Sequence, residues 1–204
     1  LQNRLDRALG IVTAGFDHQT AVVQNAVRCV RSGTDLTWAL VHSLASSSDS
    51  RSYEFTLVHE LGVVASRHDR AAYPAHLYST HPLARALAAL SPMAFEILRY
   101  LPESRDRDVI LATSTAISAD VGAARDPHVD PLDYHAVVIL TLDGASKMTF
   151  TGAVTHTLAP VGNIDLNLKH GSAVAFAGHG FNPTKHGVVT TRSRIAFMYR
   201  FLIL

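Results

Sequence analysis

The sequence predicts an α+β protein in which helices come first and a β-roll follows. Apolar residues recur at intervals of three and four over much of the first hundred positions, and the interval changes to two after position 109. The second half also breaks into short apolar runs separated by turn residues, which is typical of a sandwich, jelly roll or barrel. With 204 residues and a hydrophobic fraction of 48%, we expect a single domain over 1–204, mainly helical over 1–108 and a β-roll over 109–204.

The helical part begins with an apolar stripe over 21–30, which has the spacing of one face of a helix. This helix should end near Ser32-Gly33, because serine and glycine are common where helices stop. We expect residues 1–50 to be helical on the whole. A second helix should begin at Asp35, whose side chain is a good N-cap.

A strand and the clearest helix of the chain follow. Phe55, Leu57 and Val58 indicate a strand. Leucines and other apolar residues recur at intervals of three and four residues over 82–101, which predicts a helix. Pro102 should end that helix, because proline cannot continue it. We expect the helices to pack against one face of the sheet and to cover it.

The β-roll is expected to start with a strand at 109–111. A nearly continuous apolar run over 137–142 predicts a buried strand, which the Asp143-Gly144 turn signal should end. A short strand is expected next, at 147–150.

Three more strands are expected after that hairpin. Strict alternation over 163–169 predicts a half-buried strand, and Gly171-Ser172 should turn the chain into a strand over 173–176. The last strand is expected to open at Arg194. Its alternation places one set of side chains toward the helices and the arginine on the opposite, interior side.

Composition excludes several classes of function. A net charge of +1 gives no electrostatic footprint for nucleic acid or an anionic membrane surface. The apolar runs are too short for a membrane span. The single cysteine excludes an internal disulfide and a cysteine zinc cluster. We therefore expect a cytoplasmic protein that binds neither nucleic acid nor membrane.

The tripeptide His128-Val-Asp130 is the first candidate for a metal site. Side chains two positions apart on an extended backbone point the same way, so the imidazole and the carboxylate can bind one ion together. By itself the pattern is weak, because a chain with 12 histidines is expected to contain such a tripeptide about once by accident. A third ligand is available downstream in His186, which follows a loop containing glycine and proline and precedes an apolar strand.

The order of these residues resembles that of the Fe(II)/2-oxoglutarate-dependent oxygenase superfamily. In that family a His-x-Asp pair is followed by several strands, a distal histidine and a basic residue at the head of the last strand. Here the corresponding residues are His128 and Asp130, then His186, then Arg194, and the resemblance covers residues 109–201. It implies a double-stranded β-helix (jelly-roll) core with the N-terminal helices packed on one sheet.

The resemblance also implies cofactors and roles. His128, Asp130 and His186 would hold Fe(II), because two imidazoles and one carboxylate on one face of the ion leave three positions open. Arg194 would bind the far carboxylate of the cosubstrate 2-oxoglutarate with its planar, bidentate fork. Arg192 shares the parity of Arg194 and stays an alternative anchor.

Three further residues are candidates by their position near these motifs. Thr113 lies in the strand before the His-x-Asp pair, where the family often directs a polar side chain toward the cosubstrate. Thr115 lies on the same face and is a candidate for substrate binding. Arg125, close to the His-x-Asp pair, is a candidate for binding an anionic substrate.

The implied activity is hydroxylation of an unactivated C–H bond in a small molecule, such as an amino acid or a biosynthetic intermediate, with O₂ as the second substrate. The carboxylate of Asp130 argues against halogenation, because relatives that halogenate carry a small residue at that position. Two alternatives stay open. One is an iron-dependent oxidase or cupin-type metalloenzyme that does not use 2-oxoglutarate. The other is a non-catalytic β-roll binding module. The oligomeric state is left open.

Overall fold

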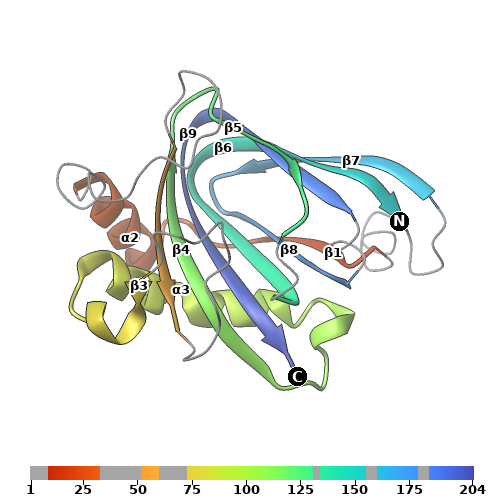
Figure 1. Ribbon diagram of the computed structural model, residues 1–204. Coiled ribbons are helices and arrows are strands. Elements are labelled where there is room, and N and C mark those ends of the chain that lie inside the picture. The colour runs from red at the N-terminus through yellow and green to blue at the C-terminus, as the bar shows by residue number, and fades with distance from the viewer. Residues whose placement is uncertain (1–8, 33–51, 60–72, 131–133, 155–159, 179–183) are drawn as a thin grey trace.

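A computed structural model of the chain is shown in Figure 1. It describes residues 9–32, 52–59, 73–130, 134–154, 160–178 and 184–204. The second helix that the sequence predicts from Asp35 onward falls outside these residues.

Nine strands of the described residues form one curved sheet, which doubles back on itself to make a roll (Figure 1). Hydrogen-bonded neighbours follow the order β1-β8-β6-β9-β4-β2-β3, with β5 added to β9 and β7 added to β6. Every described pairing is antiparallel except β2 with β3. The strands are Ile11–Gly15 (β1), Ser52–Val58 (β2), Tyr73–Pro74 (β3), Val109–Ala119 (β4), Ala124–His128 (β5), Ala136–Val154 (β6), Pro160–Lys169 (β7), Ser172–Ala177 (β8) and Lys185–Ile203 (β9).

The roll depends on β6 and β9, which are paired along most of their length and bend together. Their register shifts at several points between Thr141 and Ser146. Gly144 has φ 75°, and a β-carbon there would collide with the carbonyl oxygen of Ser193 on β9. Glycine is therefore required at this close approach of two backbones. The bend carries β6 from one layer of the roll to the other.

This bend corrects two predictions for the second half. The Asp143-Gly144 turn does not end a strand, and the expected short strand at 147–150 is the continuation of β6. The last strand does not open at Arg194 either, because β9 already begins at Lys185. In both cases a register shift keeps the strand paired through a point where the sequence indicates a break.

The first half is less helical than predicted. The segment that forms β1 was expected to be helical, but it pairs with β8, and β2 and β3 also come from this half. The predicted helix over the stripe at 21–30 is confirmed as α2 (Ala21–Ser32), which ends where expected. The strand predicted at Phe55–Val58 is confirmed as part of β2.

The long predicted helix is confirmed as α3 (Pro82–Leu98), which ends three positions earlier than expected. His81 caps it, since its Nδ1 accepts a hydrogen bond from the Leu83 amide at 3.2 Å. Pro92 lies inside the helix and cannot donate to the Ala88 carbonyl, which instead accepts from the Ser91 hydroxyl at 2.9 Å. Two short 3₁₀ helices flank α3, at Ala75–Tyr78 (η4) and Pro102–Ser104 (η5).

Two apolar clusters hold the layers together. One lies between the helices and the sheet, where Phe197 and Tyr199 of β9 pack with residues of α2 and α3. The other lies inside the roll and includes Ala196 and Met198, the alternate residues of the same strand. This alternation confirms the prediction that one set of β9 side chains faces the helices and the other faces the interior of the roll. The predicted α+β jelly roll with helices on one sheet is confirmed as well. Within the described residues, no helix has the length and apolarity needed to cross a membrane.

Candidate metal centre

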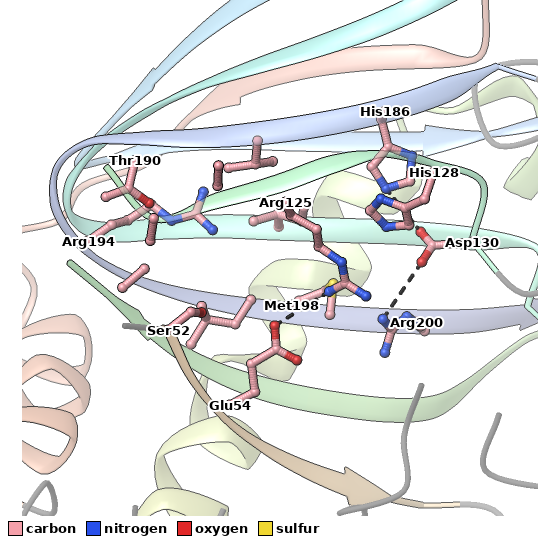
Figure 2. A pocket seen from close by; sticks show the side chains of 16 residues that line it. Ser52, Glu54, Arg125, His128, Asp130, His186, Thr190, Arg194, Met198 and Arg200 are labelled. Carbon is pink, nitrogen blue, oxygen red and sulfur yellow. Dashed lines mark hydrogen bonds and ion pairs between the residues drawn. The ribbon is translucent and has the colours of Figure 1, made fainter. Parts of the chain in front are cut away.

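The three predicted metal ligands meet in a pocket inside the roll. His128 ends β5, and His186 lies opposite it near the start of β9. Asp130 comes two positions after His128. One ligand atom from each residue lies within 4.8 Å of those from the other two. Figure 2 shows the three side chains directed toward one another.

Local sequence explains why β5 and β9 come so close. Pro127 restricts the preceding residue to extended backbone, and the pairing of β5 with β9 shifts register between Arg125 and His128. Gly187 follows His186, and a β-carbon there would lie 3.1 Å from the carbonyl oxygen of Arg125. A larger residue would therefore push β9 away from the strand that carries the first ligand.

Each imidazole has a ring nitrogen that can face a metal. The His128 Nδ1 lies 2.8 Å from the carbonyl oxygen of Asp126, which can only accept, so Nδ1 is the donor in this contact and Nε2 is the nitrogen available to a metal. Burial lowers the pKa of His186 to about 4, and the positive charge of Arg200 adds to this, although Asp130 acts in the opposite direction. At neutral pH the His186 ring is therefore uncharged and can donate a lone pair to a metal.

The carboxylate of Asp130 shows that a cation fits here. Its Oδ2 is buried, lies 3.4 Å from the His186 Nε2, and accepts no hydrogen bond from the described residues. A buried carboxylate oxygen without a donor is costly, and a bound cation would compensate it. Two imidazole nitrogens and one carboxylate oxygen form a donor set that suits Fe(II) with open coordination positions.

Arg200 is a residue of this site that the sequence analysis did not assign. Its guanidinium lies 3.7 Å from the Asp130 Oδ1 and 5.4 Å from the centre of the Tyr134 ring, and both charged side chains are 3% exposed. The arginine therefore holds the carboxylate that would ligate the metal. Its parity with Arg194 on β9 was the available signal, because both occupy the interior face of that strand.

Arg194 lies at the bend of β9 and lines the same pocket (Figure 2). Its side chain donates a hydrogen bond to the Ser146 hydroxyl at 2.7 Å, and its Nε has no partner among the described residues. Burial lowers its pKa to about 10, which leaves the guanidinium charged at neutral pH. Arg192 is exposed and does not line the pocket. The geometry thus places one of the two candidate anchors in the pocket.

The remaining candidates separate into two groups. Arg125 lines the pocket and forms an ion pair with Glu54 of β2 at 3.4 Å. Thr113 and Thr115 are buried in β4 and do not line it, and the Thr115 hydroxyl shares a hydrogen bond with that of Thr56 at 2.9 Å. The structure therefore brings Arg125 to the site and leaves the two threonines outside it.

The pocket lies inside the roll and opens to solvent. The metal ligands and Arg200 lie toward one end of it, Arg194 lies toward the other, and Arg125 and Glu54 lie between them (Figure 2). Apolar side chains complete the wall, among them Ile117, Ile139 and Met198. A small molecule can thus contact the metal position and a buried cation together.

No family model and no curated protein matches the chain. Solved structures resemble it over nearly their whole length. A prolyl hydroxylase from Trichoplax adhaerens, in complex with a peptide fragment of hypoxia inducible factor, aligns with a TM-score of 0.63 and 9% identity over 98% of this chain and 90% of that one. OsALKBH1 aligns with a TM-score of 0.56 and 14% identity over 94% and 97%. A prolyl-4-hydroxylase from Pseudomonas putida aligns with a TM-score of 0.52 and 15% identity over 94% and 91%.

These similarities concern the fold. The curved antiparallel sheet and its helices match the jelly-roll core of these solved structures. The jelly-roll fold that the resemblance implied is therefore confirmed, and His128, Asp130 and His186 form a candidate metal site within it.

Proposed function

We propose that this protein is a non-haem Fe(II)- and 2-oxoglutarate-dependent dioxygenase that hydroxylates an unactivated C–H bond of a small molecule. The single observation that carries the proposal is the pairing of two features in one pocket. These are a His-Asp-His triad, of which Asp130 and His186 are buried, and a buried arginine that lacks a carboxylate partner at its Nε. A bound Fe(II) would supply the oxidising chemistry, with O₂ and 2-oxoglutarate as its substrates.

Each residue has a defined task in this proposal. His128, Asp130 and His186 hold the metal from one side, so that the other side faces the pocket. Arg194 binds the far carboxylate of 2-oxoglutarate, because a guanidinium buried in a protein interior is stabilised by an anion. Arg200 keeps the Asp130 carboxylate in place through contact with its Oδ1. Asp130 would fill a ligand position at the metal that a halide would otherwise need, which favours hydroxylation.

A small substrate is proposed because the pocket lies inside the roll and charged side chains project into it. One of the similar solved structures binds a peptide. In this chain Arg125 and Glu54 face each other across the pocket, so a peptide beside the metal position would have to fit around this ion pair. A free small molecule meets no such restriction.

Anaerobic titration with Fe(II) and 2-oxoglutarate tests the proposal. We expect a weak visible charge-transfer band that needs both components, because a bound Fe(II) would have open positions that the oxygen atoms of a 2-oxo acid could fill. Admission of O₂ should then convert 2-oxoglutarate to succinate. Replacement of His186 by alanine should abolish the band, whereas His76→Ala, at an exposed position outside the pocket, should leave it unchanged.

The outcomes separate the alternatives. Metal binding without a response to 2-oxoglutarate would favour an iron-dependent oxidase or another metalloenzyme. The absence of any metal binding would favour a non-catalytic binding module. A His186→Ala variant that binds Fe(II) with unchanged affinity would contradict the assignment of the triad.

A further inference from the structure

An ion pair in the middle of the pocket has no task in the proposed reaction. Arg125 Nη1 lies 3.4 Å from Glu54 Oε1. The two residues belong to β5 and β2, which do not pair with each other, so they reach toward one another from separate walls (Figure 2). Their side chains are 37% and 17% exposed, so a molecule that enters the pocket can reach them.

The contact between Arg125 and Glu54 uses only a small part of the hydrogen-bonding capacity of either side chain. A guanidinium has five N–H donors and a carboxylate can accept about four hydrogen bonds. Among the described residues, the Arg125 side chain and the Glu54 side chain hydrogen-bond only to each other, at a distance near the upper limit for a hydrogen bond. Most of the binding capacity of both groups is therefore directed at the space of the pocket.

The charges around the pair indicate what could occupy this space. The other charged side chains that line the pocket are Arg194, Arg200 and Asp130. In the proposed function, Arg194 binds the cosubstrate, and Arg200 and Asp130 serve the metal. The remaining pair of Arg125 and Glu54 is neutral as a unit. An anion bound to the arginine would be repelled by the glutamate, and a cation bound to the glutamate would be repelled by the arginine.

We propose that Arg125 and Glu54 recognise the carboxylate and the ammonium of a free α-amino acid, whose side chain then extends toward the metal. A zwitterion satisfies both groups at once and keeps the pocket at the same net charge. Arginine binds the carboxylate with two parallel hydrogen bonds, and the glutamate accepts from the ammonium. This inference rests on the proposed function for the identity of the reacting centre, and it adds the substrate class.

The test uses the full chain loaded with Mn(II), which replaces Fe(II) without reacting with O₂ and broadens the NMR lines of nearby protons. Each of the twenty L-amino acids is added with and without 2-oxoglutarate, and a Zn(II)-loaded sample is the diamagnetic control. We expect at least one amino acid to show broadening that is strongest at its side-chain protons. Binding of 2-oxoglutarate is measured separately by calorimetry, so a failure of the proposed function is seen independently.

Derivatives of the amino acid that binds then assign the two contacts. The N-acetyl derivative keeps the carboxylate and loses the ammonium, and the amide does the opposite. Each should bind wild type about 10- to 100-fold more weakly than the parent, because a hydrogen-bonded charge is lost. In Glu54→Gln the N-acetyl penalty should shrink to a few fold, and in Arg125→Met the amide penalty should do so. Arg107→Met, at an exposed position outside the pocket, should keep the wild-type pattern.

Three results would overturn the inference. The first is that no amino acid is broadened by the Mn(II) protein. The second is that simple carboxylates such as propionate bind as tightly as amino acids and depend on Arg125 alone. The third is that both derivatives lose the same affinity in wild type and in both variants. Circular dichroism of each variant confirms that a changed pattern does not come from unfolding.

Discussion

Arg192 and Arg194 differ by only two positions and have opposite surroundings. The sequence could not separate them, because both share one parity on the strand. The bend of β9 leaves Arg192 in solvent and buries Arg194 against Ser146. Burial therefore distinguishes Arg194, the proposed carboxylate anchor, from Arg192. Which of the two arginines is buried depends on where β6 and β9 bend.

Replacement of Arg194 by glutamine should weaken 2-oxoglutarate binding selectively. The loss of a charge-assisted contact of about 1.5–3 kcal/mol corresponds to a roughly 10- to 150-fold higher Kd. Mn(II) affinity should stay within about twofold, since Arg194 contacts none of the three metal ligands. Calorimetry of both ligands checks this. Arg192→Gln is the matched control, and a larger effect there than at Arg194 would reverse the assignment.

His186 should make the stability of the metal-free protein depend on pH. Burial lowers its pKa from the ordinary histidine value of 6.5 to about 4 in the folded protein, so the unfolded chain binds the proton more tightly. Stability is then unaffected above pH 6.5 and falls as the pH drops from 6.5 toward 4. The expected loss between pH 7 and pH 5 is about 2 kcal/mol from this residue.

Urea unfolding at several pH values measures this loss. A His186→Leu variant should show a shallower dependence between pH 7 and pH 5, by about the amount given above. If the free energy of unfolding depended on pH equally in the variant and the wild type, the His186 ring would not stay neutral in the folded state. Metal must be removed by a chelator in both samples, because a bound ion would itself keep the ring deprotonated.

The sequence indicated the candidate ligands but not the residues that contact them. His128, Asp130 and His186 were recognisable because their order along the chain carries the pattern. Arg200 and Glu54 were not assigned, since each acquires its role from a partner on another strand. Such contacts depend on which strands become neighbours, and the periodicity of one strand does not contain that information.

Strands that bend are the elements for which the sequence was least informative. Asp-Gly is a strong hairpin signal, and at Asp143-Gly144 the positive φ is indeed present. The chain nevertheless stays paired with β9 through the bend. A turn and a sharply bent, bulged strand require the same residue types, so local sequence does not distinguish them.

Alanine at position 144 should therefore be more damaging than alanine at another positive-φ glycine of the same strand. Gly152 has φ 68° and open space around it, whereas a β-carbon at Gly144 would meet the Ser193 backbone and lie 2.9 Å from the Arg194 Cα. We expect Gly152→Ala to lower the free energy of unfolding by about 1 kcal/mol and Gly144→Ala by about 3 kcal/mol or more. Urea unfolding measures both, and equal losses would contradict the steric role of the bend.

Gly144→Ala and Gly152→Ala also test how the bend affects ligand binding in the pocket. Gly144→Ala should also raise the Kd for 2-oxoglutarate, because a displaced Ser193 moves the adjacent Arg194. Gly152→Ala should leave that Kd unchanged. Metal affinity should change little in Gly144→Ala, since the triad lies at the end of β5, just after it and near the start of β9, away from the bend.

For the molecule as a whole, the sequence predicted the fold class and the packing of helices on one sheet. It did not predict which strands pair with each other. Helices packed on one sheet followed from apolar periodicity, and the clusters on the two faces of β9 agree with it. The pairing of β1 with β8 joins residues more than 150 positions apart. Nothing local in 11–15 indicates that partner, which is why this segment was expected to be helical.

Binding of metal should stabilise the entire fold, because the ligands join β5 and the segment after it to β9. A ligand that binds only the folded state adds about 2.7 kcal/mol to the free energy of unfolding at a concentration of 100 Kd. We expect Mn(II) to give this increment and His128→Ala to abolish it. In the proposed chelate, 2-oxoglutarate should add a second increment only when the metal is present.

The Arg194→Gln variant separates the two increments in stability. It should keep the stabilisation by Mn(II) and lose most of the further stabilisation by 2-oxoglutarate. Equal stabilisation by 2-oxoglutarate with and without Mn(II) would mean that the cosubstrate does not reach the metal. The triad and the buried Arg194 would then bind separate ligands. Urea unfolding of wild type and both variants, each with metal, with 2-oxoglutarate and with the two together, decides whether the pocket works as one site.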